Sequence, residues 1–199
     1  MTKRVLTLID EANISASARD SGVHEVDWPT LAAFLVAREP GREPLETIVY
    51  VGLPPEMRDY AERRAGAERF VHELRTEGLV VVTSEGSPTG PSHYSANVDV
   101  LMALDAMDLA HTMKPDVVVL GTGDADFAYL ARRLRRLGIR VEVAAAADSI
   151  GRHLREAANT VVDLTPLFRA VAEGKRPKRR QLAGFAMGDG RSAEPPREE

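Results

Sequence analysis

Four aspartates in three short segments are the residues of this chain that are best suited to joint hydrolytic chemistry. Asp10 closes the apolar run of residues 4–10, Asp99 starts a helical stretch, and Asp124 with Asp126 follows the apolar run of residues 117–120 in the segment GTGDADF. Carboxylates gathered in one place repel each other unless a cation neutralises them, and hard oxygen ligands favour Mg²⁺ or Mn²⁺ over zinc. A metal ion beside a phosphodiester polarises the phosphoryl oxygen and activates water. The pattern therefore predicts metal-dependent hydrolysis.

The elements that must position these aspartates follow from the alternation of apolar runs and helical stretches. Apolar β-branched runs predict buried strands at residues 4–10, 47–51, 79–83, 117–120, 139–143 and 160–163. Helices are predicted over residues 28–38, roughly 55–77, 99–113, 125–137 and 149–158, whereas residues 84–97 lack apolar periodicity and are predicted to be a long loop. Because parallel strands need crossover connections, the alternation favours a mostly parallel sheet with helices on both faces. We expect one α/β, Rossmann-like domain with about five or six strands over residues 1–172.

This topology brings the aspartates to one edge of the sheet. Ligands of parallel α/β sheets bind beyond the carboxyl ends of the strands, where Asp10 and Asp124 both lie. Asp99 shares a helical face with Met102 and Ala106, so we expect its carboxylate to point inward. Each aspartate taken alone could be an ordinary helix cap, but their convergence favours a site.

The three segments resemble those of the NYN domains, the LabA-like branch of the PIN-like nucleases. The resemblance covers roughly residues 4–168, and its motifs are LIDEANI with Asp10 and Asn13, NVDVLMALD with Asp99 and Asp105, GTGDADF with Thr122, Gly123, Asp124, Asp126 and Phe127, and VVDL at 161–164. It implies a PIN-like fold, Mg²⁺ or Mn²⁺ held by the aspartates, and endoribonuclease activity on single-stranded or structured RNA. The place of Asp105 among the metal ligands rests mainly on this resemblance.

One departure from the family leaves a second interpretation open. NYN domains often carry a basic residue shortly before the helix-leading aspartate, whereas this chain has Asn97 and Val98 before Asp99. The alternative is a non-catalytic PIN-like module that binds RNA or a protein partner. A haloacid-dehalogenase-like phosphatase would need a second aspartate where Ala12 stands, and a Toprim-like enzyme would need a glutamate in place of Asp10, so both rank lower.

Several polar residues are candidates for substrate contacts. Thr122 offers a hydroxyl and Gly123 a closely approaching backbone beside a phosphate, Asn13 follows from the resemblance, and Arg19 is a cation soon after the first motif. The arginines at 132, 133, 135 and 136 are typical of a solvated helix face, with an RNA-contacting stripe as the alternative. His93 and Tyr94 either stack on a base or pack within their loop.

The composition of the chain excludes several other classes of site and protein. The chain has 199 residues and no cysteine, which excludes disulfides and cysteine zinc sites and suits a reducing cytoplasm. Its apolar runs are too short for a membrane span, and the net charge of −4 means that RNA binding must rest on local sites. Residues 173–199, first basic and then acidic, are predicted to be a disordered tail. The sequence leaves homo-oligomerisation open.

Overall fold

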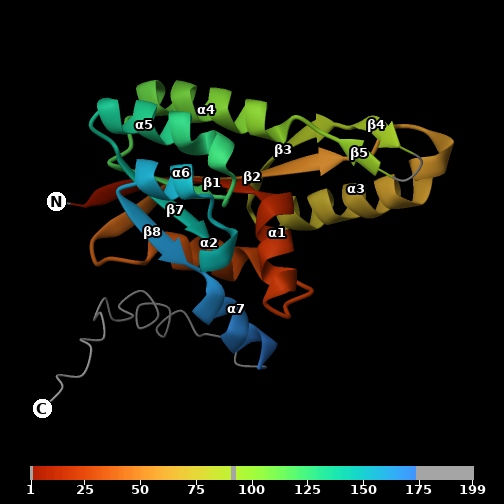
Figure 1. Ribbon diagram of the computed structural model, residues 1–199, viewed down its shortest axis with the longest axis horizontal. Coiled ribbons are helices and arrows are strands. Elements are labelled where there is room, and N and C mark those ends of the chain that lie inside the picture. Colours follow the sequence, from red (N-terminus) through yellow and green to blue (C-terminus); the bar gives the residue numbers. More distant parts are fainter. Residues whose placement is uncertain (1, 91–92, 174–199) are drawn as a thin grey trace, which may run out of the picture.

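A computed structural model describes residues 2–90 and 93–173, and it contains a central sheet of six parallel strands (Figure 1). The strand order is β3-β2-β1-β6-β7-β8. The strands are β1 (Lys3–Asp10), β2 (Arg42–Leu53), β3 (Val80–Glu85), β6 (Val117–Gly121), β7 (Arg140–Ala145) and β8 (Thr160–Asp163). The expectation of an α/β fold with a parallel sheet is confirmed. The predicted C-terminal tail lies, from residue 174 onward, outside the described residues.

Helices cover the two faces of this sheet. They are α1 (Glu11–Asp20), α2 (Trp28–Val36), α3 (Ala61–Thr76), α4 (Val98–Thr112), α5 (Ala128–Arg136), α6 (Arg152–Ala157) and α7 (Thr165–Ala172), with short 3₁₀ turns η1 (Arg58–Tyr60), η2 (Ala125–Phe127) and η3 (Ala147–Ser149). In Figure 1, α4 and α5 lie above the sheet, and α1 and α2 lie below it. Among the described residues no helix is both long and apolar enough to cross a bilayer.

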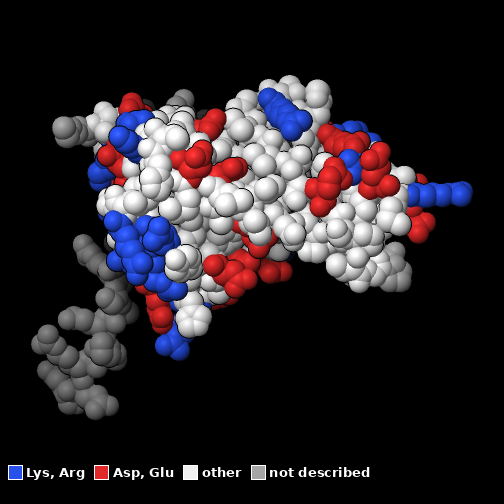
Figure 2. Space-filling view, turned by 90° about the horizontal axis from the view of Figure 1, so that it is seen from above, with Lys and Arg blue, Asp and Glu red and all other residues white. Residues whose placement is uncertain are grey.

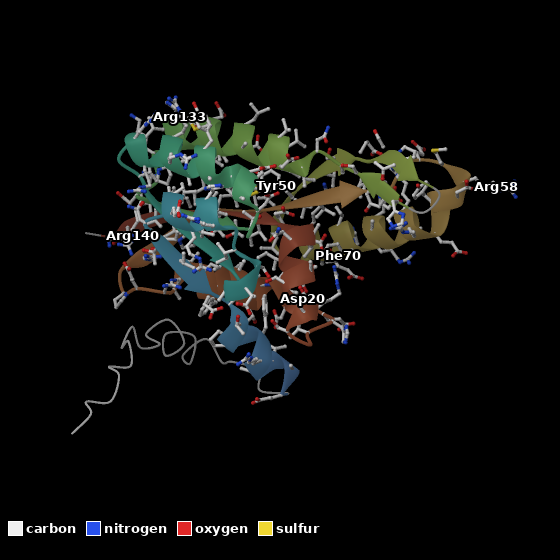
Figure 3. The ribbon with its side chains drawn as sticks, viewed as in Figure 1. Asp20, Tyr50, Arg58, Phe70, Arg133 and Arg140 are labelled. Atoms are coloured by element: carbon white, nitrogen blue, oxygen red, sulfur yellow. The ribbon has the colours of Figure 1, made fainter. Side chains whose placement is uncertain are left out.

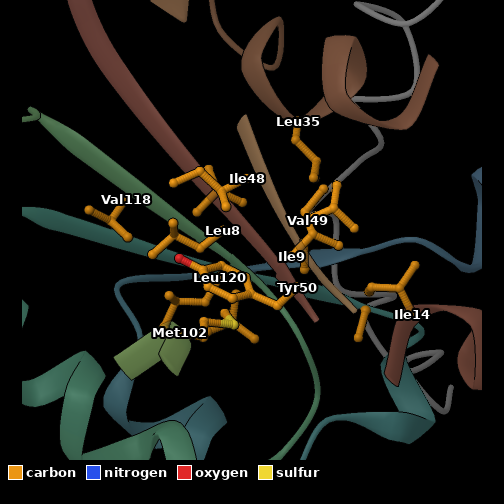
Figure 4. Packing of buried hydrophobic residues seen from close by; sticks show 14 of the residues in the cluster. Leu8, Ile9, Ile14, Leu35, Ile48, Val49, Tyr50, Met102, Val118 and Leu120 are labelled. Carbon is orange, nitrogen blue, oxygen red and sulfur yellow. The ribbon is translucent and has the colours of Figure 1, made fainter. Parts of the chain in front are cut away.

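The register of the strands decides which side chains face α4. Leu8 of β1 pairs with Ile48 of β2 and with Leu120 of β6, and laterally paired residues point to the same side of a sheet. Figure 4 shows Met102 of α4 packed on this side. Asp10 lies two residues after Leu8, so its side chain leaves the sheet on the same face, toward the start of α4.

Two helices and a hairpin depart from the sequence-based expectations. Helix α1 was not expected because its buried residues include Ser17 and Ala18, which give no apolar stripe, and α7 is a short helix at the end of the described residues. The predicted loop 84–97 contains an antiparallel hairpin of β4 (Ser87–Gly90) and β5 (His93–Ser95). Its residues are mostly exposed, so they carry none of the apolar alternation that would have revealed strands.

A buried ionic cluster lies within the sheet, away from the aspartates. Glu142 of β7 is fully buried, and its carboxylate accepts hydrogen bonds of 3.0 and 2.7 Å from the equally buried guanidinium of Arg42. Burial by itself would raise the pKa of Glu142, but the hydrogen bonds and charges of Arg42, with those of Arg38 and Arg140, outweigh it and lower that pKa. The charge of Glu142 is compensated by arginines within the fold, so the role of this cluster is structural.

We expect Glu142→Gln to lower the free energy of unfolding by about 3 kcal/mol at pH 7, because it removes the buried counter-charge of the Arg42 guanidinium and leaves only the partly exposed Glu39. The partly exposed Glu39, which also contacts Arg42, supplies the matched control, and Glu39→Gln should cost less than about 1 kcal/mol. Since the pKa of Glu142 is lowered on folding, its contribution is present above the ordinary value of 4.5 and is lost as the pH falls below it. Urea unfolding at pH 7 and pH 3.5 measures both effects, and equal losses for the two variants would contradict the account.

Candidate active site

Asp10 is the most enclosed carboxylate at the carboxyl edge of the sheet. It ends β1, is 8% exposed, and caps α1 by accepting a 3.1 Å hydrogen bond from the backbone N–H of Asn13. Burial raises the pKa of Asp10, the Asn13 hydrogen bond lowers it, and the negative charges of Glu11, Asp124 and Asp99 raise it further, with a net increase. The cap alone does not compensate the charge, so Asp10 lies in a field of like charges that favours a bound cation.

Asp124 stands beside it at the end of the neighbouring strand. Ile9 of β1 pairs with Gly121 of β6, so the loops that follow these two strands leave the sheet at the same level. The Asp124 carboxylate accepts a 2.9 Å hydrogen bond from the backbone N–H of Asp126 and thereby caps η2. Asp124 is half-buried and Asp126 is exposed, so the pair extends from the sheet edge into solvent.

A set of backbone contacts fixes the loop that carries Asp124. The amide oxygen of Asn13 accepts a 2.7 Å hydrogen bond from the N–H of Gly123, which ties the loop after β6 to α1. The carbonyl of Gly123 accepts a 2.8 Å hydrogen bond from the N–H of Gly151, and a Cβ on Gly123 would lie only 2.8 Å from the carbonyl carbon of Ser149. The start of α1 and the loops that follow β6 and β7 are therefore held together beside the aspartates.

These contacts correct the expected roles of Thr122 and Gly123. Thr122 is fully buried, and its hydroxyl accepts a 3.2 Å hydrogen bond from the N–H of Asp124 instead of facing a phosphate. Gly123 does allow a close backbone approach, but the approaching group is the Ser149 backbone. Thr122 and Gly123 are buried, and together with Asn13 they position the loop that carries Asp124.

Asp99 joins the cluster from the opposite side. It lies in the first turn of α4, where its charge acts on Asp10. Met102, Ala106 and Ala110 of the expected stripe are buried, whereas Asp99 itself is exposed at the start of the helix. The exposure of Asp99 leaves its carboxylate accessible.

Two candidates lie apart from the cluster. Asp105 accepts a 3.0 Å hydrogen bond from the hydroxyl of Tyr50, roughly 9 Å along α4 from Asp99 at 1.5 Å per residue. Burial raises the pKa of Tyr50, and the charge of Asp105 and this hydrogen bond raise it further, so the phenol stays a neutral donor. Arg19 is exposed in the last turn of α1, roughly 14 Å along the helix from Asp10. Neither contacts the carboxylates at the edge.

The sequence did not point to Glu11 as part of the carboxylate cluster, and it allowed two interpretations of Tyr94. Burial raises the pKa of both Asp10 and Tyr94, and the charge of Glu11, in the first turn of α1, raises both further. The position of Glu11 next to Asp10 was the available signal. Tyr94 is packed: its hydroxyl donates a 3.2 Å hydrogen bond to the carbonyl of Gly52, and its ring lies under the Arg63 guanidinium at 5.4 Å. The packing interpretation of Tyr94 is thus the one that the structure favours over base stacking.

Comparison with known proteins identifies the family to which this chain belongs. A family model described as the NYN domain matches residues 4–165, and this range includes every aspartate of the site. The chain belongs to the NYN domain family. This is a family of PIN-like nucleases, so membership supports a nuclease-type function in general.

The fold of this NYN domain is also found among solved structures. A protein of unknown function from Vibrio parahaemolyticus RIMD 2210633 superposes with a TM-score of 0.62 at 23% identity, over 82% of this chain and 93% of that chain. At this identity the likeness shows a shared fold. No curated protein matches the chain.

The contact between Gly123 and Ser149 predicts that Gly123→Ala destabilises the NYN domain by roughly 1–3 kcal/mol, because a Cβ meets rigid backbone there. Gly66→Ala is the matched control, since a Cβ on Gly66 meets only the flexible end of Arg69 at 3.8 Å. That control should be stabilising by about 0.5–1 kcal/mol, because alanine loses less entropy within α3. Thermal unfolding of both variants measures the difference, and a Gly123→Ala protein as stable as wild type would refute the locked-loop geometry.

The like charges around Asp10 predict that Asp10→Asn raises the melting temperature of the metal-free protein by a few degrees, which corresponds to about 1 kcal/mol. Asparagine keeps the α1 cap and removes the buried charge. Mn²⁺ should stabilise wild type, by about 2.7 kcal/mol at a hundred times its dissociation constant, and should stabilise the variant far less. Differential scanning fluorimetry with and without Mn²⁺ checks this, and an equal metal response in both proteins would be inconsistent with a cation at Asp10.

Proposed function

We propose that this NYN domain is a Mg²⁺- or Mn²⁺-dependent endoribonuclease that hydrolyses phosphodiester bonds of RNA. The observation that carries the proposal is the convergence of Asp10, Asp124 and Asp99 at the switch between β1 and β6. Burial raises the pKa of Asp10, and the charges of Glu11, Asp124 and Asp99 raise it further. Among the described residues, no cationic side chain lies within hydrogen-bonding reach of Asp10 to compensate these charges.

The chemistry of the donors fits Mg²⁺ or Mn²⁺, whereas their spacing indicates that water completes the coordination. Among the described residues, no group of three or more His, Cys, Asp or Glu side chains is arranged to hold a metal by itself. Mg²⁺ commonly keeps several waters and binds through one or two carboxylates together with substrate phosphates. Asp10 and Asp124 would supply the carboxylates, and the bound ion would polarise the phosphoryl oxygen and activate the attacking water.

The exposed members of the cluster face the side from which a substrate arrives. Asp99 on α4 and Asp126 on η2 are both exposed, so a phosphodiester can approach between these two elements. The side-chain oxygen of Asn13 accepts a hydrogen bond from the Gly123 N–H. This bond keeps the loop that carries Asp124 in place while the substrate binds. In hydrolysis the water oxygen bonds to phosphorus and the bond from phosphorus to one sugar oxygen breaks.

The direct test is cleavage of labelled single-stranded RNA in Mn²⁺ by purified protein. We expect Asp124→Asn and Asp99→Asn each to reduce the rate by about 10²-fold or more, because each removes charge from the metal and substrate site. Asp108→Asn is the matched control: Asp108 is an exposed aspartate of the same helix as Asp99 and should leave the rate unchanged.

Two outcomes would reject the proposed activity. One is the absence of cleavage by wild type over a range of RNAs with Mg²⁺ and Mn²⁺, and the other is equal cleavage by wild type and Asp124→Asn. Absence of cleavage together with retained RNA binding would favour the alternative, a non-catalytic RNA-binding module, which the lack of a preformed three-ligand group among the described residues also allows.

A further inference from the structure

A groove between α4 and α5 opens directly from the exposed side of the site. Its volume is about 450 Å³, within the usual range for small-molecule sites. Asp99 and Asp126 line it at the end that adjoins the cluster, and Arg133, about two turns along α5 from Asp126, lines it further on. Figure 3 shows Arg133 in the layer that α4 and α5 form above the sheet.

The walls of this groove carry large apolar side chains that are unusually accessible. Leu104 of α4 is 64% exposed and Tyr129 of α5 is 65% exposed, and both line the groove. The core does not need them, because α4 is anchored by Met102 and Ala106, and α5 by Leu134, all fully buried. Exposed aromatic and aliphatic groups around a concave surface are typical of a binding site.

Charges around the groove distinguish between a nucleic acid and a second protein chain. Figure 2 shows a broad white surface with a group of blue atoms at the lower left and a separate group of red atoms nearer the middle of the lower edge. The core of a protein interface is depleted of charged residues, whereas this groove is small and has carboxylates at one end and a guanidinium at the other. A nucleotide matches this pattern, since its base stacks on an aromatic ring and its phosphate pairs with arginine.

We propose that the α4–α5 groove binds one nucleotide of single-stranded RNA next to the phosphodiester that is cut, with the base against Tyr129 and Leu104 and a phosphate at Arg133. This inference rests on the proposed function, because Asp99 and Asp126 belong both to the groove and to the site. The groove would make the protein select unpaired RNA, because a base within a duplex is not free to enter it.

The test is the affinity of a fluorescein-labelled single-stranded RNA octamer, measured by fluorescence anisotropy in the full-length Asp124→Asn protein with Mn²⁺. Tyr129→Ala should weaken binding about tenfold, and Tyr129→Phe should retain the affinity because its ring still stacks. Arg133→Gln should weaken binding and reduce the slope of log affinity against log salt by about 1. Arg132→Gln is the matched control, an exposed arginine of α5 that does not line the groove, and it should have a smaller effect.

Any one of three results would overturn the inference. These are no binding of the octamer, an unchanged RNA affinity of the Tyr129→Ala variant, and equal effects of the Arg133→Gln and Arg132→Gln variants. A dimer of the parent protein that Tyr129→Ala dissociates in sedimentation velocity would also overturn it, in favour of a second copy of the chain. Failure here can be told apart from failure of the proposed activity. If wild type cleaves RNA but the affinity does not depend on Tyr129, only the proposed groove site is rejected. If RNA binding depends on Tyr129 but wild type does not cleave RNA, only the proposed nuclease activity is rejected.

Discussion

The parallel pairing of β1 with β6 is the constraint on which the site depends. Strands β2 and β3 lie on one side of β1, and β6, β7 and β8 lie on the other, so the chain changes direction between β1 and β6. At such a switch point the loops that follow two adjacent strands diverge and leave room for a ligand. Asp10 ends β1 and Asp124 follows β6, and the hydrogen bond from the Gly123 N–H to Asn13 joins the loop after β6 to the first turn of α1. Both aspartates therefore lie on backbone that hydrogen bonds hold in place.

Two buried carboxylates, Glu142 and Asp10, differ in how far their charge is compensated by neighbouring groups. Glu142 and Asp10 both lose water on burial, which raises the pKa of each. Arg42 and its neighbours reverse that effect at Glu142, whereas Asp10 is surrounded by further carboxylates that increase it. A buried charge that the protein neutralises contributes to structure, and one that it leaves uncompensated is a candidate for function. The contrast within one chain is the physical reason for placing a cation at Asp10 rather than at Glu142.

Sequence patterns predicted the sheet well because its central strands β1, β6 and β7 are buried on both faces and are therefore rich in apolar residues. They did not predict α1, whose inward side includes Ser17 and Ala18, or the β4–β5 hairpin, which is mostly exposed. At the site, the order of the motifs predicted that Asp10, Asp99 and Asp124 share one edge, and their joint role stays a prediction. The role of Gly123 could not be predicted from the sequence, because it depends on the loop after β7, which approaches only in the folded chain. The same holds for the groove, whose walls come from two helices that are separate in sequence.

The central claim is that Asp10 and Asp124 share a divalent cation at the switch point. Anomalous diffraction from crystals grown with Mn²⁺ tests it most directly. The account predicts an anomalous peak between the carboxylates of Asp10 and Asp124, on the side of the sheet where α4 begins, with water at the remaining coordination positions. A map with no peak at this edge, or with its only peak elsewhere on the molecule, would contradict the account.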